Sequence, residues 1–405
     1  MIGPMTTSVV DILVGAVLFA WLLVAAVSCF SVYRAQKYRF LPYLPTVQWV
    51  LIIPVRDVPA HLAEMWRGIS AQSCRSFRVI FAVESAADPV YAALRALQGG
   101  PPMEIVVAGP TTKRAQKVHN ILAALATLKD SDTVVIFADA DIVPHPDWAA
   151  RLIKWQMQVS TTDVVSGYRW MIPTDNRWAT TFVCVINSSL ATAARVPPFA
   201  GAWGGSMVIH RDAIAGLELK KLWNCAALDD LTLTRAVWAH GGRVHNPRDA
   251  LVLSPVSFNW KDALAFGRRQ YLFIRIHLPW HWALMAAITT LPLAGWAVAV
   301  LLAIKGSVTA ISVVVVANVL DQFRAYFRRR VPQIMWNMKT PDRVARLDQW
   351  GTPVWLLVNA VVIWSTLFGR RIKWAGRTYV VDGQGQVLRV ETAHEPQRNP
   401  SPAVG

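Results

Sequence analysis

Residues 8–33 form a long apolar run that only Asp11 interrupts, near its start. A helix of this length spans the roughly 30 Å hydrocarbon core of a bilayer. No Lys or Arg precedes the run and the apolar stretch is long, which argues against a cleaved signal peptide. Arg34, Lys37 and Arg39 follow it, so the positive-inside rule predicts an outside N-terminus and a cytoplasmic chain from residue 40 onward.

Three further apolar segments lie at 281–304, 307–323 and 353–368. The chain has 54% hydrophobic and 16% charged residues, which is too apolar for an ordinary soluble protein. Its net charge of +16 suits nucleic acid, anionic lipid or an anionic nucleotide as a partner. Much of the excess lies beside apolar segments, which favours a membrane and argues against nucleic acid: Arg324, Arg328, Arg329, Arg330, Arg370, Arg371, Lys373 and Arg377.

These patterns predict the organisation of the chain. We expect a membrane helix in 1–40, a soluble domain in 41–257, an interfacial segment in 258–280, membrane helices in 281–369 with an interfacial stretch at 331–350, and a basic segment with a disordered tail in 370–405. Four crossings would return the C-terminus to the outside, against the positive-inside rule. The segment 353–368 is short and begins at a proline, so we expect it to be re-entrant or interfacial.

The soluble domain alternates predicted strands with predicted helices. Strands are expected at 49–55, 78–83, 104–108 and 133–138, and helices at 61–71, 90–97 and 116–128. This alternation predicts an α/β fold with a mostly parallel sheet covered on both faces. The four cysteines are scattered without C-x-x-C spacing, which indicates reduced thiols rather than disulfides or a zinc site: Cys29, Cys74, Cys184 and Cys225.

Asp139 and Asp141 follow the buried strand predicted at 133–138. Ligands of parallel sheets bind just beyond the carboxyl ends of the strands. Two carboxylates one residue apart at that edge can hold Mg²⁺ or Mn²⁺, and the ion can hold a diphosphate. A D-x-D motif alone is more often a solvated turn, so its neighbours decide its meaning.

Polar residues also follow or begin the neighbouring elements. Glu84 follows a strand and can accept hydrogen bonds from a base or a ribose, although a solvated loop glutamate is the alternative. Lys113, Arg114 and Lys117 stand before and at the start of the helix that carries Asn120. Cations at a helix N-terminus suit a diphosphate, and solvated charge is the alternative.

Two later patterns suit an acceptor and a general base. The stretch 201–206 offers Trp203, Gly204, Gly205 and Ser206 for close approach or stacking on a sugar or an acyl chain, with a plain turn as the alternative. Asp229 and Asp230 begin the amphipathic segment 231–239, where paired acids either cap a helix or act in catalysis. Proximity of the two acids can raise a pKa enough for proton transfer.

The order of these motifs resembles family 2 and family 21 glycosyltransferases, especially the ceramide glucosyltransferase type and its bacterial lipid-glycosylating relatives. The resemblance runs from the first membrane helix to about Val381. The family's acid after the second strand is matched by Glu84, and its Lys-x-x-Asn helix start by Lys117–Asn120. Its second acid is matched by Asp139, its Gly-rich patch by Gly204–Ser206 and its third acid by Asp230. The late W-x-G-R-x-Y element is matched by Trp374–Tyr379.

The chain departs from the family pattern at three places. The first acid is usually Asp and is Glu84 here, and the acid before the base is often Glu and is Asp229 here. The (Q/R)-x-x-R-W motif is replaced by Arg268-Arg269-Gln270-Tyr271, whose cations and polar groups we place at the donor diphosphate.

The resemblance implies a Rossmann-like GT-A domain that transfers a sugar, with inversion, from a nucleotide donor, most often UDP-linked. It implies Mg²⁺ or Mn²⁺ at Asp139 and Asp141, and Asp230 as the base that deprotonates a lipid hydroxyl. Ceramide and diacylglycerol are both acceptable acceptors, and the activity would belong to glycolipid biosynthesis. Integration into a bacterial inner membrane with a cytoplasmic catalytic domain follows from the same resemblance.

Two other readings stay open at this point. A processive polysaccharide synthase shares the acids and membrane helices but normally keeps an intact Q-x-x-R-W motif. A degenerate, non-catalytic membrane protein that binds lipid or a partner is favoured by the altered 268–271 segment and disfavoured by Asp139, Asp141 and Asp230.

Overall fold

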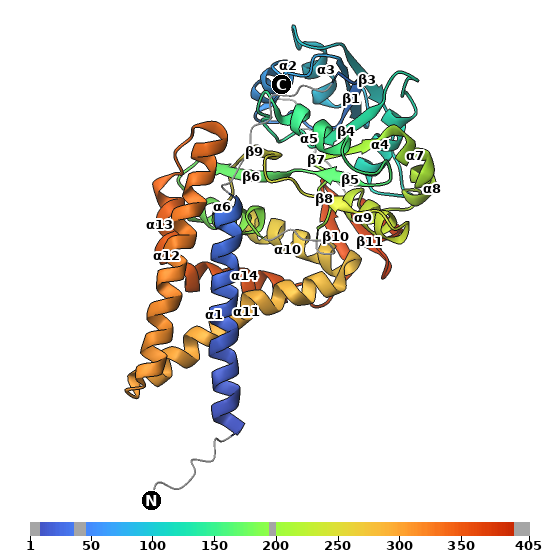
Figure 1. Ribbon diagram of the computed structural model, residues 1–405. Helices are drawn as coiled ribbons and strands as arrows, with labels where there is room; N and C mark the ends of the chain where they lie inside the picture. Colours follow the sequence, from blue (N-terminus) through green and yellow to red (C-terminus); the bar gives the residue numbers. More distant parts are fainter. Residues whose placement is uncertain (1–8, 36–45, 194–199, 393–405) are drawn as a thin grey trace, which may run out of the picture.

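The computed structural model describes residues 9–35, 46–193 and 200–392. Figure 1 shows a domain built on a central sheet, from which the long helices α1 (Val9–Ala35) and α12 (Val308–Trp336) extend away, while α11 (Pro279–Ile304) runs obliquely toward the far end of α12. Helices α10 (Trp260–His277) and α14 (Thr352–Trp364) lie at the junction between the sheet domain and these long helices. The soluble and apolar parts expected from the sequence are therefore spatially distinct.

The central sheet has seven strands in the order β3-β2-β1-β4-β7-β5-β8. Strands β1 to β4 are mutually parallel, whereas β7 runs antiparallel to both of its neighbours. This arrangement confirms the expected α/β, mostly parallel fold. The strands are β1 (Trp49–Pro54), β2 (Phe77–Val83), β3 (Met103–Val107), β4 (Val134–Ala138), β5 (Val164–Ser166), β7 (Ser206–His210) and β8 (Val244–His245).

Strand β1 illustrates why the central strands are apolar on both faces. Val50 and Ile52 pack into one core with α4, while Leu51 and Ile53 pack into a second core with α2, α3 and α5. Successive strand residues point to opposite faces, so a strand covered on both sides has no polar face. The helices of this domain are α2 (Leu62–Ser70), α3 (Pro89–Arg95), α4 (Gln116–Leu125), α5 (Trp148–Gln156), α6 (Trp178–Ala191), α7 (Arg211–Gly216), α8 (Leu219–Leu222) and α9 (Asp230–Ala239).

Two smaller sheets complete the domain. β6 (Tyr168–Pro173) pairs in parallel with β9 (Leu251–Val256). The C-terminal sheet contains β10 (Arg371–Trp374), β11 (Arg377–Val381) and β12 (Val387–Thr392), all antiparallel. The expectation of a disordered tail is wrong for 387–392, because β12 completes this sheet and the Val387 amide donates to the Cys225 carbonyl at 2.6 Å. The remaining predicted tail, 393–405, lies outside the described residues.

Within residues 9–35, 46–193 and 200–392, three helices are long and apolar enough to cross a membrane. They are α1 (Val9–Ala35), α11 (Pro279–Ile304) and α12 (Val308–Trp336), with 27, 26 and 29 residues. The fourth apolar segment forms α14 (Thr352–Trp364), whose 13 residues give roughly 20 Å of helix, short of the bilayer core. α12 continues through Pro332 to Trp336, so the interfacial stretch predicted from 331 is the end of α12 followed by α13 (Asp342–Trp350).

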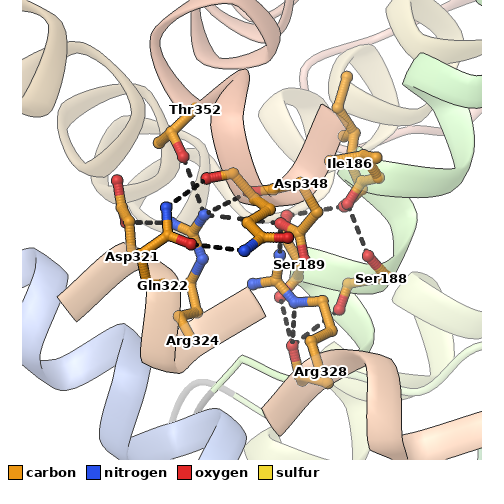
Figure 2. A network of polar contacts seen from close by, with 12 residues as sticks. Ile186, Ser188, Ser189, Asp321, Gln322, Arg324, Arg328, Asp348 and Thr352 are labelled. Atoms are coloured by element: carbon orange, nitrogen blue, oxygen red, sulfur yellow. Dashed lines mark hydrogen bonds and ion pairs between the residues drawn. The ribbon is translucent and has the colours of Figure 1, made fainter. Parts of the chain in front are cut away.

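A buried ionic network ties α12 to its neighbours (Figure 2). Arg324 donates to Asp321 at 2.6 Å and to the Thr352 hydroxyl at 3.0 Å, at the start of α14. Arg328 contacts Asp348 of α13 at 2.5 Å and the Thr192 hydroxyl, just beyond α6, at 3.3 Å. Because buried charges need partners, these contacts fix α6, α13 and α14 relative to α12.

Candidate active site

A cavity of about 710 Å³ opens beyond the carboxyl ends of β1 and β4. Strand order reverses between these two strands, because β2 lies on one side of β1 and β4 on the other. Such a switch point is where ligands bind in open α/β sheets. The cavity wall continues from the sheet edge to α6, α10 and α14, so one space joins the soluble domain to the apolar helices.

Asp139 and Lys117 meet at the floor of this cavity. Asp139 directly follows β4, and Lys117 lies in the first turn of α4, with 2.8 Å between Lys117 Nζ and Asp139 Oδ1. Lys117 Nζ also lies 3.3 Å from Oδ2 of the fully buried Asp229. Asn120, one turn further along α4, donates from Nδ2 to the Ala82 carbonyl at the end of β2. The sequence-predicted donor residues of α4 are therefore anchored to the sheet edge.

Lys117, Asp139 and Asp229 form an ion cluster in which neighbouring opposite charges offset the cost of burying each charged group. Burial disfavours the charged form of Lys117, yet Asp139, Asp229 and Asp230 together hold its pKa above the ordinary value. Burial likewise opposes ionisation of Asp139, but the Lys117 charge outweighs it and lowers the Asp139 pKa. Both groups are thus charged at neutral pH.

Asp229 and Asp230 begin α9 and have different surroundings. Asp229 is the N-cap residue by position, but its side chain makes no capping hydrogen bond and is directed to Lys117 instead. Asp230 accepts hydrogen bonds from the amides of Gly204 at 2.8 Å and Leu231 at 2.6 Å. Burial, and then the neighbouring Asp229 charge, raise the pKa of Asp230 to about 7. This pKa suits a group that takes up a proton near neutral pH.

Gly204 and Gly205 leave room for these carboxylates. A Cβ on Gly204 would lie 2.3 Å from Asp229 Oδ2, and a Cβ on Gly205 would lie 2.6 Å from Asp139 Oδ2. Neither glycine, nor Ser206, lines the cavity. The Ser206 hydroxyl is fully buried and accepts a hydrogen bond from Trp148 Nε1 at 2.9 Å. The geometry therefore gives these three residues a packing role, and of the predicted acceptor residues only Trp203 reaches the cavity.

Asp141 lies across the cavity floor from Lys117. Enclosure by the cavity walls, and then the Asp139 charge, raise the pKa of Asp141. About half of its side chain still reaches solvent in the cavity, and its ion-pair contact among the described residues is distant, 3.9 Å to Arg169 Nη1. Asp141 is thus accessible to a ligand, whereas Asp139 is already held by Lys117.

Arg169 is a cavity residue that the sequence pattern does not single out. It lies on β6, and its guanidinium carbon is 4.9 Å from the Trp203 ring centroid and 5.3 Å from the Phe266 centroid. Arg269 covers the same Phe266 ring at 5.6 Å. Burial, and then the nearby Arg169, lower the pKa of Arg269. A cation within an otherwise apolar strand is the signal that could identify Arg169.

Not every residue of the 268–271 segment reaches the cavity. Arg269, Gln270 and Tyr271 line the cavity, but Arg268 does not. On α10 (Trp260–His277), Arg268 is directed instead toward the loop after α14, where its Nη2 lies 3.7 Å from the Cβ position of Gly369. The Tyr271 hydroxyl donates to Asn359 of α14 at 2.6 Å, which joins α10 to α14. Lys113 is exposed and also lies outside the cavity lining.

Glu84 is held by the C-terminal sheet. Arg377 of β11 donates to Glu84 at 2.5 Å and to Gln116 of α4 at 3.0 Å. The backbone amide of Gln116 in turn donates to the Tyr379 hydroxyl at 3.3 Å. Trp374 and Ala375, at the β10–β11 turn, line the cavity, and Arg56 donates to the Ala375 carbonyl. The late Trp-x-Gly-Arg-x-Tyr element therefore contributes to one wall of the cavity through Trp374, Ala375 and Tyr379, whereas Glu84 itself lies outside the lining.

No group of three or more His, Cys, Asp or Glu side chains forms a protein-only metal site within 9–35, 46–193 and 200–392. The cavity floor nevertheless suits a divalent ion. Four carboxylates face one lysine and one arginine there, and Mg²⁺ is commonly held by one or two carboxylates together with substrate phosphates. Asp139 and Asp141 are the pair whose chemistry fits this role.

The mixed sheet, the Asp-x-Asp pair at its switch point and the paired acids of α9 define the class of nucleotide-sugar-dependent GT-A glycosyltransferases. Within that class the chain belongs to glycosyl transferase family 21, the ceramide glucosyltransferase-like family, whose model matches residues 12–387. The predicted family, the fold class and the assignment as an enzyme are therefore confirmed. Comparison with curated proteins gave no match.

Three of the solved structures with partial similarity hold a nucleotide or a nucleotide sugar. The mannosyltransferase PcManGT from Pyrobaculum calidifontis, in complex with GDP-Man and Mn²⁺, is 18% identical over 81% of this chain and 98% of its own, with a TM-score of 0.44. S. aureus TarS 1-349, in complex with UDP-GlcNAc, is 10% identical over 86% of this chain and 100% of its own, with a TM-score of 0.37.

The third is glucosyl-3-phosphoglycerate synthase from Mycobacterium tuberculosis, in complex with Mn²⁺, UDP and phosphoglyceric acid. It is 14% identical over 60% of this chain and 80% of its own, with a TM-score of 0.36. These likenesses are distant, and the family assignment rests on the family match over residues 12–387.

Proposed function

We propose that this family 21 enzyme transfers a hexose, with inversion, from a UDP-sugar to a hydroxyl group of a membrane lipid such as ceramide or diacylglycerol. The observation that carries the proposal is the continuity of the cavity. Its floor holds Asp139, Asp141 and Asp230, and its far wall is apolar. That wall is contributed by α6, α10 and α14: Ala179, Phe182, Val183, Ile186, Leu190, Leu264, Val358 and Val362.

The apolar wall suits a lipid acceptor because it adjoins the helices that are long enough to cross a membrane. α14 packs against α11, and α10 packs against both α11 and α14. An acyl chain can leave the bilayer along these helices while its polar head reaches the acids. Burial of each methylene against the wall contributes roughly 0.8 kcal/mol.

Asp230 has the geometry and pKa of the proposed base. Its carboxylate is oriented by the Gly204 and Leu231 amides and faces the cavity. It takes the proton of the acceptor hydroxyl, whose oxygen then bonds to the anomeric carbon while the bond from that carbon to the diphosphate oxygen breaks. Asp229, held by Lys117, keeps the Asp230 pKa high without entering the reaction.

Cations in the cavity wall balance the charge of the departing diphosphate. Arg169 and Arg269 both line the cavity, and both guanidinium groups lie near the Phe266 ring. Asp139 and Asp141 would hold Mg²⁺ or Mn²⁺, which supplies further positive charge for the leaving group. Glu84, oriented by Arg377, would accept hydrogen bonds from the nucleoside.

A membrane assay with a catalytic variant tests this function. Membranes containing the wild-type chain are incubated with a panel of labelled nucleotide sugars, and extracted lipids are analysed by mass. We expect a sugar-bearing lipid from wild type and a loss of about 10²–10⁴-fold with Asp230→Asn, because general base catalysis contributes that range. A normal rate with Asp230→Asn would refute the base assignment.

A further inference from the structure

Arg268, Arg275 and Arg370 form a cluster beside the loop between α14 and β10. Arg275 of α10 donates to the Gly369 carbonyl, and Arg268, two turns earlier on α10, places Nη2 3.7 Å from the Cβ position of Gly369. Arg370 follows Gly369 in the chain; its Nη2 lies 3.7 Å from the Cβ position of Gly383, and its charge acts on Arg275. The cluster therefore joins two elements that are about 100 residues apart in sequence.

Positive charge in this cluster is not neutralised by the protein. Among the ion pairs of the described residues, none involves Arg268, Arg275 or Arg370. Arg275 Nε is buried and makes no hydrogen bond within the described part of the chain. Burial, and then Arg370 and Arg268, lower the pKa of Arg275. Like charges held this close are unfavourable unless an anion joins them.

Exposed apolar side chains surround the cluster. Phe368, next to Gly369, is 78% exposed, and Trp280, at the start of α11, is 84% exposed. The start of α11 packs on the end of α14, where Trp282 Nε1 donates to the Thr366 hydroxyl at 2.9 Å. Aromatic residues beside basic ones at the end of a membrane helix are typical of the lipid headgroup region.

We propose that Arg268, Arg275 and Arg370 form a binding site for the phosphate of an anionic membrane phospholipid, separate from the donor and acceptor cavity. The phosphodiester sits among the three guanidinium groups, and the acyl chains lie along Phe368 and Trp280. The exposed apolar rim favours a lipid over free phosphate, because inorganic phosphate has no apolar part to bury there.

The lipid site has a consequence for the rate of sugar transfer, and this consequence rests on the proposed function. Arg269 faces the cavity from the same turn of α10 that presents Arg268 to the lipid site. A bound phosphate relieves the repulsion among Arg268, Arg275 and Arg370 on one side of α10. It thereby holds the helix turn that presents Arg269 to the cavity on its other side. Anionic lipid is therefore expected to increase transfer without being consumed.

Lipid retention by the purified full-length protein tests the site independently of turnover. The protein is placed in nanodiscs of phosphatidylcholine with or without phosphatidylglycerol, and bound lipid is counted by native mass spectrometry. We expect wild type to retain phosphatidylglycerol, and Arg268→Gln/Arg275→Gln/Arg370→Gln to bind it about a hundredfold more weakly, since each cation near a lipid surface contributes about fivefold.

A matched variant removes three cations from the adjacent sheet: Arg371→Gln/Lys373→Gln/Arg389→Gln. Arg371 and Arg389 are paired with Glu391, so this variant should retain lipid like wild type. Equal lipid loss in both triple variants would overturn the proposal, as would displacement of the lipid by millimolar inorganic phosphate. Thermal unfolding of each variant, and the three single variants, separate lost binding from lost folding.

Discussion

At the scale of single residues, Asp230 sets the expected pH dependence. Its pKa is raised to about 7, and in the proposed mechanism its deprotonated form is the base. We expect kcat/KM to fall about tenfold per pH unit below that value and to level off above it. Asp229→Asn removes the nearby negative charge, so the midpoint should move to lower pH. A profile that is flat between pH 5 and 8 would contradict the assignment.

Gly205 has a strict steric role in the site. A Cβ there would lie 2.1 Å from the Trp203 ring and 2.6 Å from Asp139 Oδ2. Gly205→Ala should displace both groups and lower transfer by at least tenfold, measured as initial rate with saturating substrates. Gly216→Ala is the control, because a Cβ there meets nothing within 4 Å. Equal activity of the two variants would show that the backbone adjusts freely at Gly205.

Single residues also show which parts of the candidate site can be predicted from sequence and which cannot. Asp139, Asp230 and Lys117 are predictable because strand ends and helix starts mark the edge of the sheet. The sequence pattern predicts Lys113 and Arg268 at the donor, but neither lines the cavity. The direction of a side chain depends on loop conformation and helix phase, which the pattern does not specify. Arg169 is missed because its importance comes from packing between Trp203 and Phe266, which are distant in sequence.

At the scale of elements, the C-terminal sheet contributes a wall of the cavity, and we propose that it supports the donor nucleotide. Arg377 on β11 holds both Glu84 and Gln116. Removing one partner of a charge-assisted hydrogen bond costs roughly 1.5–3 kcal/mol. Arg377→Gln should therefore raise the KM for the nucleotide sugar about tenfold or more, with little change in the KM for the acceptor.

Two variants make this prediction specific to the contact. Arg377→Lys, which keeps the charge, should recover part of the donor affinity. Arg389→Gln removes an exposed cation of β12 that pairs with Glu391 and should leave the donor KM unchanged. An equal rise in both KM values with Arg377→Gln would indicate general disruption of the sheet. Sequence alone identifies the Trp-x-Gly-Arg-x-Tyr element, but its contact with Glu84 joins residues 293 positions apart.

At the scale of the whole molecule, the lengths of the apolar helices favour one membrane topology over the alternative with four crossings. Helices α1, α11 and α12 are long enough to span, and α14 is too short. An odd number of crossings places the chain after α12 on the side opposite the N-terminus. The basic residues 370–377 then share a side with the catalytic domain, as the positive-inside rule requires.

Protease accessibility tests this topology. In inside-out vesicles a tag after residue 392 and a tag in the catalytic domain should be cleaved together, and a tag before residue 9 should be protected. Opposite behaviour of the C-terminal and catalytic-domain tags would mean that α14 crosses the membrane. The short α14 could be expected from the sequence, because 353–368 begins at a proline, but its packing on α10 through Tyr271 and Asn359 could not.

We propose that one cavity brings a nucleotide sugar and a membrane lipid to Asp230. Purified protein is reconstituted with a defined hydroxylated lipid and given a labelled UDP-sugar, and the extracted lipids are analysed by mass. We expect a lipid that carries one added sugar of inverted anomeric configuration, formed by wild type and not by Asp230→Asn. Free sugar or a polymer as the only labelled product, with no glycosylated lipid, would contradict it.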